Sequence, residues 1–108
     1  SRSAEDIRIQ AERILPGLRE ALGTAYRVDI MDADSQVGSG SLPTRTIPST
    51  AIAVRSAGGD DVTRQLLAAF RNLPVPVIGY VNKGQLLLDL RCMDDEDDFL
   101  SQLGALRL

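Results

Sequence analysis

Arg91 is the residue of this chain whose position best suits the binding of an anion. It ends a predicted strand over Leu86–Arg91, in which Asp89 shares its face and leucines occupy the opposite face. A guanidinium held at the end of a strand can grip a carboxylate or a phosphate through two parallel hydrogen bonds. An ion pair between Arg91 and Asp89 fits the same spacing, so the pattern leaves both interpretations open.

A run of glycine and serine is the second candidate for anion binding. Gly38, Ser39, Gly40 and Ser41 precede a Leu-Pro pair, and successive small residues allow backbone amides to approach an anion. The run is neither GxGxxG nor GxxxxGK[ST], and it does not lead directly into a helix. The motif alone therefore favours a turning connection over a phosphate-binding loop.

The remaining reactive side chains do not form a complete active site. The chain has no histidine, and Cys92 is its only cysteine, so neither a disulfide nor an activating Cys–His pair can form within it. Lys83 lies in a predicted hairpin turn, whereas a Schiff-base lysine needs desolvation or a cationic neighbour to lower its pKa. The acidic run over 94–98 lacks the spacing of a calcium-binding loop and is typical of the first turn of a helix. We expect no metal site.

Composition limits the class of protein. Twelve basic and fifteen acidic residues give a net charge of −3, which argues against autonomous binding to nucleic acid. No apolar run is long enough to cross a bilayer, and the first six residues do not have the character of a signal peptide. With 108 residues, 44% of them hydrophobic, we expect one folded, soluble domain located in the cytoplasm.

The hydrophobic pattern predicts an α+β fold, with a small and mainly antiparallel sheet and helices on one face of it. Pro16 is expected to kink the first helix or to divide it into two abutting helices. The predicted order is α-β-β-α-β-β-α, with these bounds: a helix between Ser3 and Gly23, a strand over Tyr26–Met31, an irregular segment over 32–49, a strand over Thr50–Arg55, a helix capped by Asp60 or Asp61 that ends at Pro74, strands over Val77–Val81 and Leu86–Arg91, and a helix from about Asp94.

The same periodicities predict the hydrophobic core. Its expected members are Ile14, Leu18, Val28, Ile30, Ile52, Val54, Leu66, Phe70, Ile78, Leu88, Leu90, Phe99 and Leu103.

Several segments, in the same order along the chain, give it a resemblance to a known family. They are the leading helix over 2–13, Ser35 to Pro43, Ile47 to Ala51, Leu73 to Gly79, and Leu86 to Cys92. Together these segments resemble the C-terminal part of bacterial selenocysteine synthase, L-seryl-tRNA(Sec) selenium transferase. Each segment is weak alone, but the whole series is specific.

The resemblance implies that residues 1–108 form the C-terminal small domain of a fold-type I pyridoxal-phosphate enzyme. The full-length family member is a homo-oligomer that converts L-seryl-tRNA(Sec) to L-selenocysteinyl-tRNA(Sec) with selenophosphate. Its aldimine lysine lies in the large domain, and so does its cofactor, so the isolated chain is expected to be inactive. The expected partner of this chain is that large domain.

The resemblance also strengthens the case for Arg91, because fold-type I enzymes often place a carboxylate-binding arginine on a strand after such a hairpin. In an aminoacyl-tRNA that carboxylate is esterified, so Arg91 could instead meet the ester, a tRNA phosphate, selenophosphate or a local acid. Two other classes stay open: the small domain of a different fold-type I lyase, and a non-enzymatic interaction or regulatory module.

Overall fold

The computed structural model describes residues 2–37 and 45–108. The chain begins with helix α1 (Ala4–Leu22), which is closed at both ends as predicted. At its start, the Ser3 hydroxyl accepts the N–H of Asp6 at 3.1 Å, and the Asp6 carboxylate accepts the N–H of Ser3 at 3.2 Å. At its end, Gly23 adopts a φ of +76°, a conformation that glycine reaches at low cost.

Helix α1 runs through Pro16 as one element, so of the two expected outcomes, a kink or two abutting helices, the division does not occur. Proline removes the hydrogen bond that the carbonyl of Glu12 would accept. Both Pro16 and Glu12 are exposed, so water can reach that carbonyl. Ile14 and Leu18, on either side of the proline, are fully buried and anchor both halves of the helix to the core.

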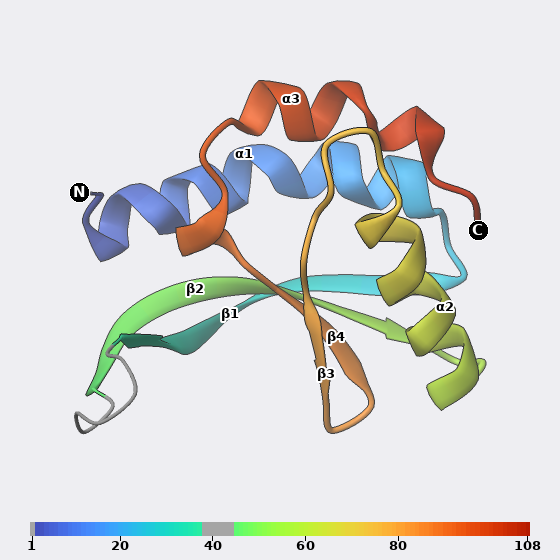
Figure 1. The fold of residues 1–108 in the computed structure, drawn as a ribbon, viewed down its shortest axis with the longest axis horizontal. Helices are drawn as coiled ribbons and strands as arrows, with labels where there is room; N and C mark the ends of the chain where they lie inside the picture. The colour runs from blue at the N-terminus through green and yellow to red at the C-terminus, as the bar shows by residue number, and fades with distance from the viewer. Residues whose placement is uncertain (1, 38–44) are drawn as a thin grey trace.

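The sheet has four strands in the order β1-β2-β4-β3, and every neighbouring pair is antiparallel. Strands β1 (Tyr26–Val37) and β2 (Arg45–Ser56) pair along their whole length. Strand β4 (Gln85–Asp89) pairs with β2 only over 51–54, and β3 (Tyr80–Asn82) pairs with β4. The first half of β2 and the second half of β1 therefore extend past β4 as a two-stranded ribbon (Figure 1).

This ribbon corrects the prediction of an irregular segment over 32–49. Residues 32–37 and 45–49 lie in strands, and Gly38, Ser39, Gly40 and Ser41 lie outside the described residues. Aspartate, serine, glutamine and proline are poor strand formers, so local propensity favours a loop here. Continuous pairing of Asp32 with Thr50 through Val37 with Arg45 overrides that propensity.

The helices gather on one face of the sheet, which confirms the predicted α+β architecture. Helices α1 and α3 (Glu96–Ser101) lie over the strands, and α2 (Asp60–Arg71) lies toward the end opposite the ribbon (Figure 1). Helix α2 begins after Gly59, and not after a capping aspartate as predicted. Two short 3-10 turns, η1 (Leu90–Cys92) and η2 (Leu103–Ala105), flank α3.

The core lies between that face and the helices. Eleven of the thirteen predicted members are buried in it: Ile14, Leu18, Val28, Ile52, Val54, Leu66, Phe70, Leu88, Leu90, Phe99 and Leu103. Ile30 is partly buried against this cluster. Ile78 is 65% exposed, so its placement in the core is wrong. It lies before β3 in an unpaired segment, so the alternation of a strand does not apply to it.

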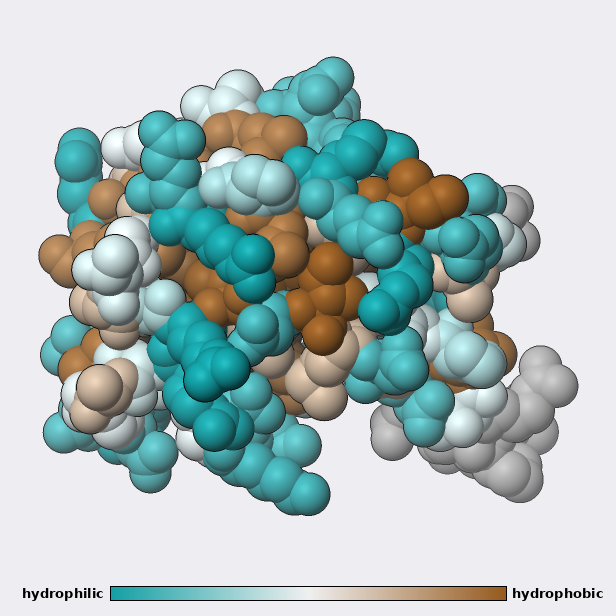
Figure 2. Space-filling model, turned by 180° about the vertical axis from the view of Figure 1, so that it is seen from behind, coloured by the Kyte–Doolittle hydropathy of each residue, from teal (hydrophilic) through white to brown (hydrophobic). Residues whose placement is uncertain are grey.

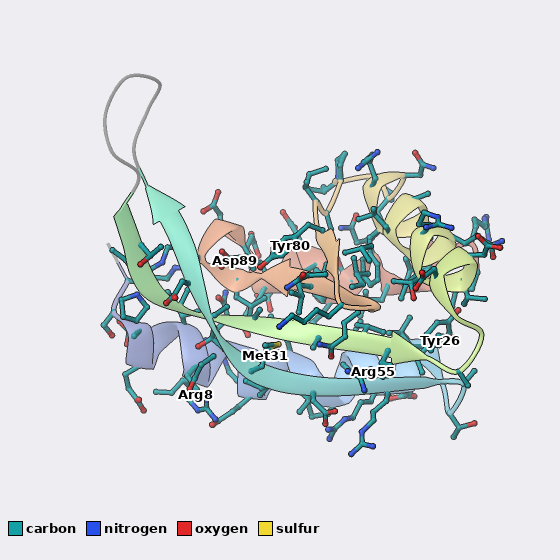
Figure 3. The ribbon with its side chains drawn as sticks, turned by 90° about the horizontal axis from the view of Figure 1, so that it is seen from below. Arg8, Tyr26, Met31, Arg55, Tyr80 and Asp89 are labelled. Carbon is teal, nitrogen blue, oxygen red and sulfur yellow. The ribbon has the colours of Figure 1, made fainter. Side chains whose placement is uncertain are left out.

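The other face of the sheet carries no helix among the described residues. Cross-strand partners share a face, which puts Tyr80 and Leu87 together with Ala53 on this side. Met31, Arg55 and Tyr80 lie on it in the view from below (Figure 3). Seen from behind, hydrophilic residues cover most of the molecule and hydrophobic residues show between them near the middle of that view (Figure 2).

Candidate functional site

Arg91 lies in the 3-10 turn η1, two residues beyond the end of β4, and not in the strand as predicted. The cause is Asp89, whose carboxylate accepts the backbone N–H of Arg91 at 2.9 Å and so caps the turn. The pairing of β4 with β2 ends at Asp89, which lies opposite Ala51.

The guanidinium of Arg91 reaches across to the two-stranded ribbon. Its Nη2 donates to the carbonyl of Pro48 at 2.6 Å. Its Nε is buried and finds no hydrogen-bond partner among the described residues. A buried donor without an acceptor costs about 1–3 kcal/mol, which the other contacts of this turn must offset.

Asp89 connects three elements at this point. Besides capping η1, its Oδ1 accepts the hydroxyl of Ser49 at 3.0 Å, and Ser49 is only 4% exposed. Asp89 lies at the end of β4, where the chain turns toward the 3-10 turn (Figure 3). The carboxylate therefore joins β4, β2 and η1 and fixes the backbone that carries Arg91.

Arg2 holds the same turn from the start of the chain. Its Nη2 donates to the carbonyls of Leu90 and Arg91, at 3.0 and 2.9 Å, and its Nη1 donates to Gln10. Sequence reasoning missed Arg2, Pro48 and Ser49. No local pattern could reveal them, because each lies forty or more residues along the chain from its partner near η1.

Lys83 occupies the turn between β3 and β4, as predicted. Its φ is +52° and that of Gly84 is +77°, the positive pair that a tight two-residue hairpin turn requires. The side chain of Lys83 is exposed. Lys83 therefore lacks the desolvation that favours Schiff-base formation by a lysine.

The acidic run begins helix α3, as its composition predicts. The Asp95 carboxylate caps the helix by accepting the N–H groups of Asp97 and Asp98, at 3.0 and 3.1 Å. Glu96 pairs with Arg13 across to α1 at 2.6 Å. The hydrogen bond from Arg13 holds the pKa of the Glu96 carboxyl below its usual range, against partial desolvation and the charge of Asp95. In the described part of the chain, no group of three or more potential ligand side chains is placed to hold a metal ion.

These features define a class of protein before they define a family. The described residues form a small α+β domain in which Arg91 is held at the end of the sheet by Asp89, Arg2 and Pro48. The family model for L-seryl-tRNA selenium transferase matches residues 1–94, and the chain belongs to that family. Among the described helices, none has the length and apolar character needed to span a membrane.

Individual relatives agree with the family model. A Methylocella silvestris protein named L-seryl-tRNA(Sec) selenium transferase is 44% identical over 106 residues, which cover 98% of this chain and 23% of that protein. Proteins of the same name from Escherichia coli and Shigella boydii are each 46% identical over 104 residues, covering 95% of this chain and 22% of theirs. The chain therefore spans less than a quarter of the length of these curated relatives.

Proposed function

We propose that this chain is the C-terminal small domain of a pyridoxal-phosphate-dependent L-seryl-tRNA(Sec) selenium transferase of fold type I. The full-length enzyme would convert L-seryl-tRNA(Sec) to L-selenocysteinyl-tRNA(Sec) with selenophosphate, as a homo-oligomer in the cytoplasm. The observation that carries the proposal is the identity of 44–46% over nearly the whole chain to proteins that bear this name. The family match favours this function over another fold-type I lyase and over a non-enzymatic module.

The described residues do not fit pyridoxal phosphate. The cofactor supplies an electron sink for carbanion chemistry when a lysine and a phosphate-binding cup hold it. Lys83 is the only lysine of the sequence, and it is exposed in a hairpin turn. We therefore assign the aldimine lysine and the chemical step to the remaining polypeptide, and a binding role to this domain.

Arg91 is the residue that we assign to substrate binding. Its backbone is held by Asp89 and Arg2, and its guanidinium by Pro48, so little conformational entropy remains to be lost when an anion binds. The exposed end of the guanidinium, where Nη2 binds Pro48, is the part of the side chain that an oxygen of that anion could reach. A tRNA phosphate, selenophosphate or the aminoacyl ester would each present such an oxygen. Gly38, Ser39, Gly40 and Ser41 remain candidates for anion binding from the sequence alone.

The proposal is tested on the full-length enzyme. Purified enzyme should form selenocysteinyl-tRNA from seryl-tRNA(Sec) and selenophosphate, and should lose this activity when pyridoxal phosphate is removed. The isolated chain, mixed with stoichiometric cofactor and borohydride, should give no pyridoxyl adduct on Lys83. An adduct there, or a cofactor-loaded full-length enzyme that transfers no selenium, would contradict the proposal.

A further inference from the structure

A pocket of about 370 Å³ lies on the molecule between the segment before β3, the end of β4 and helix α3. We call it the acidic groove. The residues that line it from the segment before β3 are apolar, and most of its carboxylates come from α3 and the residues just before that helix. The lining residues are Val75, Pro76, Val77, Ile78, Leu88, Asp89, Met93, Asp94, Asp95, Asp98, Phe99 and Gln102.

The segment before β3 exposes large hydrophobic side chains to solvent at one side of the acidic groove. Val75 and Ile78, which both line the acidic groove, are 54% and 65% exposed. Scattered single exposed hydrophobic residues are normal, but a contiguous patch marks a surface that another body covers. Because both residues line one pocket, they form an exposed apolar patch of that kind at its edge.

The groove is built before anything binds to it. The side chain of Gln102 forms two hydrogen bonds with the backbone of Val75, and the N–H of Val77 donates to the carbonyl of Phe70 at 3.0 Å. On the inner side, Gly79 lies so close to β4 that a Cβ there would stand 2.7 Å from the carbonyl oxygen of Leu87. Because the segment over 75–79 is already fixed by these contacts, it loses little conformational entropy on association, which favours binding.

Charge decides what kind of partner fits. Asp94 and Asp98 are exposed, and their carboxylates have no hydrogen-bond or ion-pair partner in the described part of the chain. Asp95 is engaged in capping α3 and Asp89 in binding Ser49. No basic residue lines the groove among the described residues. Carboxylates at a hydrophobic pocket select a cation and repel a phosphate backbone.

From this geometry we infer that the acidic groove receives a segment of the enzyme's own remaining polypeptide. That segment inserts an apolar side chain beside Ile78 and Phe99 and sets an arginine or lysine against Asp94 and Asp98. More than three quarters of the length of the relatives lies outside this chain, so a large body is available to cover the patch. The inference rests on the proposed function in one respect, namely that the chain is part of that longer enzyme.

Photo-crosslinking in the full-length enzyme identifies the occupant. A benzoylphenylalanine replaces Ile78, and a matched variant carries it at Ile9, which is 40% exposed on α1 and outside the groove. We expect position 78 to crosslink within its own polypeptide, to a peptide that contains an arginine or lysine beside an apolar residue. A crosslink to tRNA, to a second subunit or to no peptide at all would overturn the inference, as would the same crosslinked peptide from position 9.

A pair of charge reversals tests the role of the carboxylates. Asp97 and Asp98 are neighbours in the first turn of α3 and both are exposed, but only Asp98 lines the acidic groove. Asp98→Lys should lower the yield of the position-78 crosslink at least tenfold, while Asp97→Lys should leave it within about twofold. Equal yields in the two variants would overturn the inference. The crosslink does not depend on catalysis, so a full-length protein without selenium transferase activity would contradict the proposed function alone.

Discussion

Gln102 binds the backbone of Val75 with both groups of its side-chain amide. The N–H of Val75 donates to Oε1 at 2.8 Å, and Nε2 donates to the carbonyl of Val75 at 2.7 Å. The amide thus acts toward residue 75 as a neighbouring strand would, although it comes from the turn after α3. It is the contact that fixes the segment between α2 and β3 against the last helix.

Gln102→Ala should therefore destabilise the domain through this segment. Two hydrogen bonds of about 0.5–1.5 kcal/mol each would be lost, and because the site is exposed we expect about 1–2 kcal/mol from denaturant unfolding. Gln65→Ala on α2 is the matched control, since its exposed side-chain amide makes no hydrogen bond with the described residues. Equal midpoints for the two variants would show that the contact with Val75 does not stabilise the fold.

Leu88→Ala should be among the most destabilising changes in the sheet. Leu88 is 1% exposed and belongs to the core cluster, so truncation leaves a cavity and should cost about 2–5 kcal/mol in denaturant unfolding. Ile78→Ala provides the comparison, because the same loss of side chain at 65% exposure should cost less than about 0.5 kcal/mol in the isolated chain. A small effect at Leu88 would mean that the face of β4 is wrongly assigned.

The pair of Arg13 and Glu96 predicts a dependence of stability on acid. The pKa of Glu96 is lower in the folded state than in the unfolded state, where it is about 4.3. The stabilisation is therefore fully present above that pH and disappears as the pH falls through the folded pKa. Wild type should lose more stability than Glu96→Gln between about pH 5 and pH 3.

The measurement is the denaturant midpoint of both proteins across that range. Both side chains are partly exposed, at 54% and 24%, so the difference should be modest and should shrink in high salt. Glu20→Gln, at an exposed position of α1, is the control for removing a carboxylate in general. If it changes the acid profile as much as Glu96→Gln does, the pair is not the cause.

Much of the fold follows from local sequence signals. The capping box at Ser3, the glycine that ends α1 and the positive φ at Gly84 each rest on residues a few positions apart. The helical and alternating spacings likewise identify most of the core, because burial in a regular element repeats with its period.

The errors arise where distant partners decide the conformation. The ribbon over 32–37 and 45–50 is polar in sequence and becomes β structure through pairing. Arg91 leaves the strand because Asp89 caps a turn, and its guanidinium finds Pro48 through the sheet register. Ile78 is exposed although its sequence context is apolar, because it lies before β3 in a segment without strand pairing. The anion-binding role of Arg91 thus stays a prediction, and its contacts with Pro48 and Arg2 could not be predicted from the sequence.

Arg91 could bind substrate or could only hold η1 in place, and the variant Arg2→Ala is the control that distinguishes these two roles. Arg2→Ala removes the hydrogen bonds to the carbonyls of Leu90 and Arg91, and so loosens η1 while leaving the guanidinium of Arg91 in place. In the full-length enzyme we expect it to lower the melting temperature and to reduce kcat only a few-fold. It thereby measures how much turnover depends on holding this turn.

Arg91→Ala should instead reduce turnover far more than stability. If Arg91 meets an anion mainly in the transition state, its loss should lower kcat about a hundredfold, the scale seen when an oxyanion donor is removed. The lost bond to Pro48 is a single exposed contact, so the melting temperature should fall by no more than in Arg2→Ala. Arg91→Lys keeps the charge but cannot reach Pro48 and an anion with one planar group, and should recover only part of kcat. If Arg91→Ala instead lowers the melting temperature and leaves activity per folded molecule near normal, then Arg91 is a structural link between η1 and the ribbon and does not bind substrate.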